Sequence, residues 1–83
     1  MDKAIKGLQH LIGKEVEIVT IHEWFGKEKY NCKFDFILDD RRIGFKVQNS
    51  EIYVLRSDLE ALEEVDDAYY IKDFLMEIII KSQ

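Results

Sequence analysis

The spacing of apolar residues along the chain changes near Gly13. In residues 2–12 apolar side chains recur every three or four positions with lysines between them, which is typical of an amphipathic helix. From Lys14 the period becomes two, and Val16, Ile18 and Thr20 alternate with glutamates and a valine. The pattern predicts a helix over 2–12 and β structure over 14–80.

Alternation returns further along the chain in three short segments. Apolar and polar residues alternate over 33–38, over 43–47 and again over 52–55. Polar turn residues separate these segments at Asp39–Arg42 and at Gln48–Ser50. The pattern predicts three strands joined as hairpins. The segment His22–Asn31, which precedes them, is polar and aromatic. We expect it to form either a loop that carries a binding platform or a long hairpin that caps one end of the barrel.

The stretch after residue 55 has a different pattern. Ser57 is followed three residues later by Glu60, a spacing typical of a helix capping box. We expect one or two helical turns that end by about Val65, then a turn at Asp66–Ala68. The segment 69–80 returns to strand, with a possible break near Lys72.

The final strand is apolar on both faces. Phe74, Met76, Ile78 and Ile80 alternate with Leu75, Glu77 and Ile79. Because such a strand needs cover on both sides, we expect it to be central or part of a closed barrel. The N-terminal helix or a second subunit would cover its outer face.

This order of elements resembles the small SH3-like and Sm-like barrels. The resemblance implies a mostly-β fold with an N-terminal helix, a five-stranded, strongly bent antiparallel barrel, and a short helical turn before the last strand. Sm-like proteins end their fourth strand with an Arg-Gly-Asp or Arg-Gly-Asn turn that faces RNA, and Val54–Asp58 is similar. Ser57 replaces the glycine, however, and no asparagine follows Asp35 where the family has one.

Composition narrows the class of protein. The 83 residues fit a single domain, 47% of them are hydrophobic, and ten aromatics can supply a core. The one cysteine excludes an internal disulfide, and with no apolar leader it favours a cytoplasmic protein. No apolar run is long enough to cross a bilayer. The net charge of −5 disfavours phosphate binding. Nucleic acid is therefore an unfavoured partner, although the sequence does not exclude it.

No residue pattern indicates catalysis, a cofactor or a metal. His10, His22 and Cys32 lack the spacing of metal ligands. We interpret them as a helix-surface histidine, a loop histidine and a small buried thiol. Because no nucleophile has an orienting base that the sequence identifies, we expect a non-enzymatic protein.

Three segments are candidate partner-binding sites. The first two are an aromatic platform or barrel cap in the loop, and a pair of arginines in a solvated turn. The third is an acidic run that forms a solvated helix face or a docking patch. The candidate residues are Trp24, Phe25, Tyr30, Arg41, Arg42, Asp58, Glu60, Glu63, Glu64, Asp66 and Asp67.

The sequence favours a small protein-interaction module that binds a protein partner. Self-association into a homo-oligomer is expected through the last strand or the helix. Two alternatives remain: an Sm-like RNA-binding oligomer, and an acidic inhibitor that mimics nucleic acid.

Overall fold

Two antiparallel sheets and one short helix form the fold. The computed structural model describes residues 2–83, and of Asp2 only the backbone. More than half of the chain is strand, as the sequence predicted. The elements are α1 (Asp2–Gln9), β1 (Glu15–His22), β2 (Gly26–Lys33), β3 (Phe36–Leu38), β4 (Arg42–Val47), β5 (Ser50–Leu55), the 3-10 helix η1 (Arg56–Ala61), β6 (Glu63–Val65), β7 (Ala68–Lys72) and β8 (Met76–Ser82).

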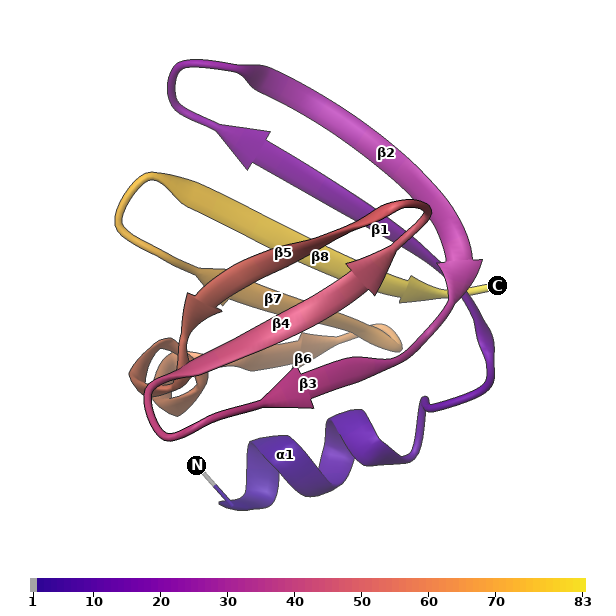
Figure 1. Cartoon of the computed structure of the whole chain (residues 1–83). Coiled ribbons are helices and arrows are strands. Elements are labelled where there is room, and N and C mark those ends of the chain that lie inside the picture. The colour runs from indigo at the N-terminus through magenta and orange to yellow at the C-terminus, as the bar shows by residue number, and fades with distance from the viewer. Residues whose placement is uncertain (1) are drawn as a thin grey trace.

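The sheets face each other across a shared core. The larger sheet has the strand order β2-β1-β8-β7-β6, and the smaller has the order β3-β4-β5 (Figure 1). Apolar side chains at alternate positions of both sheets meet between them. The largest fully buried side chains in this core include Phe34, Phe45, Ile18 and Ile80.

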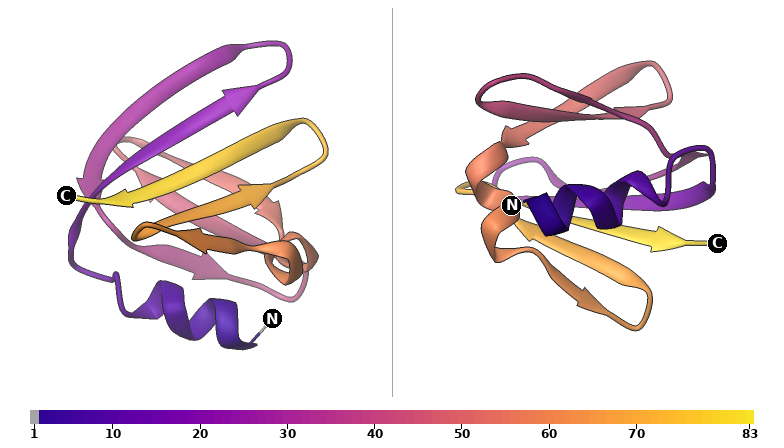
Figure 2. Two further views of the ribbon diagram at one scale, coloured as in Figure 1. Left: turned by 180° about the vertical axis from the view of Figure 1, so that it is seen from behind. Right: turned by 90° about the horizontal axis from the view of Figure 1, so that it is seen from below.

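The helix α1 closes one side of the space between the sheets. Its residues Ile5 and Leu8, with Leu11 just after it, belong to the core shared by both sheets. Seen from below, α1 lies across the gap between the two layers (Figure 2). The helix is shorter than predicted, because turns begin at His10 and Gly13 has a positive φ of 86°.

The final strand β8 is central, as predicted, because β1 and β7 pair with its two edges. Its outer face is not covered by α1, so that part of the prediction is wrong. The view from behind shows no helix or strand of residues 2–83 over this face (Figure 2). Val19 and Ile79 are directly opposite each other there, and Val19 is only 2% exposed. The cover on this face therefore comes from neighbouring side chains of the same sheet.

The sheets are not closed into a barrel, and residues 2–83 form eight strands where five were predicted. The segment 22–31 forms a hairpin, which is one of its two expected forms, and β2 pairs with β1 from Gly26 to Lys33. The predicted single strand over 69–80 is a second hairpin, β7–β8, that turns at the expected break. The strand over 33–38 is divided, since β2 ends at Lys33 and β3 starts at Phe36.

The helical turn before the last strands is a 3-10 helix. It begins after Leu55, and no side chain caps it. The predicted capping box of Ser57 and Glu60 is therefore wrong, because both residues lie inside η1. Leu59 anchors this turn in the core.

Within residues 2–83, no helix has the length and apolar character needed to cross a bilayer.

Candidate partner-binding surface

The β1–β2 hairpin holds two exposed aromatic side chains on a compact turn. The Nδ1 atom of His22 accepts hydrogen bonds from the backbone N–H groups of Trp24 (3.0 Å) and Phe25 (3.3 Å). The rings of His22 and Phe25 are 4.7 Å apart between centroids. Trp24 is 71% exposed and Phe25 is 77% exposed. The turn therefore presents both aromatics to solvent on an ordered backbone.

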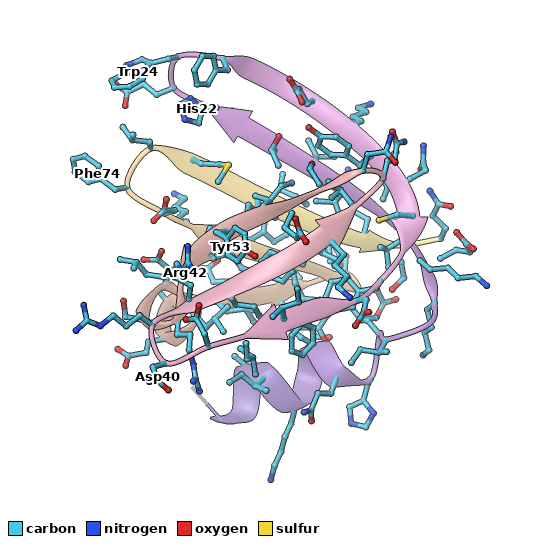
Figure 3. The ribbon with its side chains drawn as sticks, in the orientation of Figure 1. His22, Trp24, Asp40, Arg42, Tyr53 and Phe74 are labelled. Atoms are coloured by element: carbon cyan, nitrogen blue, oxygen red, sulfur yellow. The ribbon has the colours of Figure 1, made fainter. Side chains whose placement is uncertain are left out.

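The β7–β8 hairpin adds a third exposed aromatic beside them. Phe74 is 92% exposed at the end of this hairpin. The Glu23 N–H donates to the carbonyl of Leu75 at 3.0 Å, which ties the two turns together. Trp24 and Phe74 project from the same end of the molecule (Figure 3). We call Trp24, Phe25 and Phe74 the tip surface.

Tyr30 lies apart from the tip surface, on the inner face of β2. It is half-buried and packs against the core. Its hydroxyl donates a hydrogen bond to Glu28, and this bond with partial burial raises the tyrosine pKa. Both residues line a cleft of about 200 Å³ between the sheets, together with Thr20, Phe25, Ile52, His22, Gly26 and Met76. Of the predicted aromatic residues, Trp24 thus lies at the tip, Tyr30 lies in the cleft, and Phe25 borders both.

In the turn between β3 and β4, the Arg42 side chain contacts other residues of the same chain. The Asp39 carboxylate accepts the backbone N–H groups of Arg41 (2.9 Å) and Arg42 (2.7 Å). These bonds hold the pKa of Asp39 below its usual range. The Arg42 guanidinium pairs with Asp39 at 3.3 Å and lies 4.6 Å from the ring centroid of Tyr53. Arg41 is exposed beside it.

The acidic run does not form one helix face, so that interpretation is wrong. Glu60 is exposed on η1, while Glu63 and Glu64 lie on the edge strand β6. Because successive strand residues point to opposite faces, those two carboxylates diverge. Burial raises the pKa of Tyr69 on the inner face, and the nearby Glu64 carboxylate raises it further. Asp66 and Asp67 form the β6–β7 turn with φ of 52° and 63°.

Asp58 is the one member of this run with a strongly shifted acidity. Its pKa is raised to about 6 by loss of solvent, by hydrogen bonding with the Asp73 side chain and by repulsion from that carboxylate. Its Oδ2 atom is buried and has no donor among residues 2–83. Asp58 is therefore protonated below about pH 6, which removes its repulsion with the Asp73 carboxylate.

His10, His22 and Cys32 are not brought together. His10 is in the turns after α1, whereas His22 and Cys32 lie on β1 and β2. No cluster of three metal-ligating side chains exists in the described part of the chain. Burial raises the pKa of the Cys32 thiol, which contacts the Lys46 carbonyl at 3.7 Å. A half-buried thiol with a raised pKa is a poor nucleophile.

Comparison with known proteins gives no match, either to family models, to curated proteins or to solved structures. No sequence pattern identifies Phe74 or Tyr53 as a surface feature. The alternation of apolar residues places Phe74 on a strand face, although the break near Lys72 is a signal that it lies in a turn.

Proposed function

We propose that this chain is a non-enzymatic protein-interaction module that binds a protein partner through the tip surface. The observation that carries the proposal is the exposure of Trp24, Phe25 and Phe74 on two turns joined by a backbone hydrogen bond. Large exposed apolar groups that gather at one place mark interaction sites more often than scattered ones do.

The energetics favour a protein partner. Aromatic side chains bury about 150–250 Å² each, and tryptophan is among the residues enriched at binding hot spots. The His22 bonds fix the turn before binding, which lowers the entropy lost on association. The net charge of −5 argues against phosphate as the group bound here.

Self-association through the last strand or the helix is restricted by the fold. β8 is paired on both edges, and the apolar face of α1 is in the core. Of these two elements, β8 therefore offers a second copy its outer face, which no helix or strand of residues 2–83 covers. The dispersal of the acidic run also gives less support to a nucleic-acid mimic, and the Sm-like RNA-binding oligomer gains no support from the two open sheets.

Variant-dependent capture from a source-cell lysate tests the tip surface. The full chain, the double variant Trp24→Ser with Phe74→Ser, and the control Ile12→Ser would be immobilised side by side. Ile12 is also an exposed apolar residue, but it lies before the start of β1, beside Cys32 and Lys33 at the end of β2, whereas the tip follows the end of β1. The proposal expects one protein band that is captured by the wild type and the control and is lost with the double variant.

Absorbance of the eluate at 260 and 280 nm identifies the class of partner. A protein partner leaves the ratio typical of protein, whereas nucleic acid raises it. Equal capture by all three chains, or a captured nucleic acid, would contradict the proposal.

A further inference from the structure

The edge strand β5 has no protection of the kind that the other edges carry. β2 has Lys27, Lys29 and Lys33 along its length, and charged residues on an edge oppose strand pairing. β3 and β6 have three residues each, so they offer little to pair with. β5 has six residues, of which Glu51 alone is charged. It is therefore the edge most open to an added strand.

The register fixes which backbone groups of β5 face outward. Leu55 is opposite Arg42, and the next N–H, that of Arg56, donates to the Arg41 carbonyl at 2.8 Å. In an antiparallel ladder this pattern means that every second residue of β5 bonds to β4. Glu51 and Tyr53 are in the other set, so their N–H and C=O groups point away from β4. No strand of residues 2–83 pairs with that side.

The cleft of about 200 Å³ lies beside this edge. Ile52 of β5 forms one side, and Thr20, Tyr30 and Met76 of the larger sheet are on the other. Residues that lie opposite one another in a sheet point to the same face. In a strand added to β5, the residue beside Ile52 would therefore direct its side chain into the cleft. The volume suits one large apolar side chain.

The charges around the cleft favour a basic partner. Glu28 lines the cleft and is exposed, and Glu51 is exposed on the edge itself. The whole chain carries a net charge of −5. A segment with lysine or arginine near its apolar residue would gain from both carboxylates, because complementary charge raises the rate of association.

We infer that β5 and the cleft together bind an extended peptide segment, which adds a strand to β5 and places one apolar side chain, flanked by a basic residue, in the cleft. Backbone bonds to Glu51 and Tyr53 supply affinity, and the cleft supplies selectivity. This inference deepens the proposed interaction function and rests on a surface that shares only Phe25 with the tip surface, because Trp24 and Phe74 do not line the cleft.

Selection of random peptides of about nine residues, displayed on phage, against the full chain tests the inference. Enriched peptides would be synthesised and titrated by calorimetry. They should share one large apolar residue with lysine or arginine within two positions. Because the surface is small, affinities of about 10–100 µM are expected.

Two variants with matched controls locate the site. Glu51→Pro removes an outward N–H but no bond to β4. It should weaken peptide binding about tenfold, because the peptide loses roughly one backbone hydrogen bond. Glu51→Ala keeps that N–H and should lose much less. Glu28→Lys should also weaken basic peptides about tenfold, whereas Glu63→Lys, with the same charge change on β6, should have no effect.

Several outcomes would overturn the inference. One is that no peptides are enriched, and another is that peptides bind the Glu51→Pro variant as tightly as the wild type. A third is a dimer of the chain, seen in sedimentation equilibrium, that this substitution dissociates. Peptide binding that survives Trp24→Ser with Phe74→Ser, while lysate capture does not, would separate the two surfaces. Each proposal can therefore fail without the other.

Discussion

At the scale of single residues, His22 shapes the tip surface without belonging to it. Its Nδ1 atom accepts two backbone N–H groups, so removal of the ring should loosen the turn. His22→Ala should accelerate amide hydrogen exchange at Trp24 and Phe25, at a cost of about 0.5–1.5 kcal/mol per lost bond.

The matched variant His22→Asn keeps a side-chain acceptor, because asparagine accepts backbone N–H groups in turns. Exchange at both amides should then stay close to that of the wild type. Equal acceleration in the two variants would mean that the ring itself, rather than the hydrogen bonds, orders the turn.

The pair of Asp58 and Asp73 makes stability depend on pH. Because the folded pKa of Asp58, about 6, exceeds the ordinary value of 3.8, its contribution is fully present below pH 3.8 and is lost as pH rises through 6. At pH 7.5 the ionised Asp58 carboxylate destabilises the fold. Asp58→Asn should therefore stabilise the fold there by about 1 kcal/mol, well below the roughly 3 kcal/mol that the full shift implies, because solvent screens a half-buried group.

Urea unfolding at pH 7.5 and pH 4 measures this effect. The gap between the Asp58→Asn variant and the wild type should close toward pH 4. Asp40→Asn, an exposed control with the same charge change, should show no such pH-dependent gap. A gap that is constant with pH would contradict the raised pKa of Asp58.

Sequence patterns predicted residue environments well where alternation was regular. Phe45 and Ile43 in β4 are buried as their spacing implied. The environment of Asp58 could not be predicted from local sequence, because its neighbour Asp73 is fifteen residues away and lies near it only in the folded chain. Phe74 was misplaced because its apolar character suits a strand as well as a turn.

At the scale of elements, the β6–β7 hairpin turns on two residues in a left-handed conformation. Asp66 and Asp67 have φ of 52° and 63°, the geometry of a hairpin turn that favours glycine. Asp67→Gly should raise the free energy of unfolding by about 0.5–1 kcal/mol, since it removes the cost of a side chain there. Thermal unfolding measures the gain. The control Asp40→Gly, in another turn, should give none.

Gly44 is required by the packing of β4 against β5. An added Cβ would lie 2.6 Å from the Tyr53 ring, opposite it in the ladder. Gly44→Ala should therefore destabilise the fold by about 1–3 kcal/mol. Tyr53→Ala in the same chain should recover part of this loss in urea unfolding. An additive loss in the double variant would show that the clash is not with Tyr53.

Strands with one apolar face were predicted, and strands without one were not. β2 reads Gly-Lys-Glu-Lys-Tyr-Asn-Cys-Lys, with mostly polar residues on both faces. Such a strand forms because it pairs with β1 along its length, which local propensity does not reveal. The same holds for the short acidic β6. Both are sheet edges, where polar residues oppose aggregation.

At the scale of the whole molecule, α1 completes the core that the two open sheets leave incomplete. Leu8 is fully buried among residues of both sheets. Leu8→Ala should lower the free energy of unfolding by about 2–5 kcal/mol, whereas the exposed Ile12→Ala should change it little. Urea unfolding compares them. Equal effects would mean that α1 lies on the surface without filling the core.

The helix was predicted from its pattern, but its position was not. An apolar stripe shows that a helix packs on something, and it does not show which surface. The barrel prediction failed for a related reason. Hairpin order is shared by closed and open β folds, and closure depends on which distant edges pair.

The central position of β8 also sets the order in which the fold can form during synthesis. The β1–β2 hairpin and the β3–β4–β5 meander can pair as soon as they leave the ribosome, because their partners are neighbours in sequence. The second edge of β1 can pair only after β8 is made, and β8 is the last strand of residues 2–83 to be synthesised. Until it arrives, the inner apolar residues of β1 have no second neighbour. Nascent chains that stop before residue 76 should therefore remain substrates for chaperones.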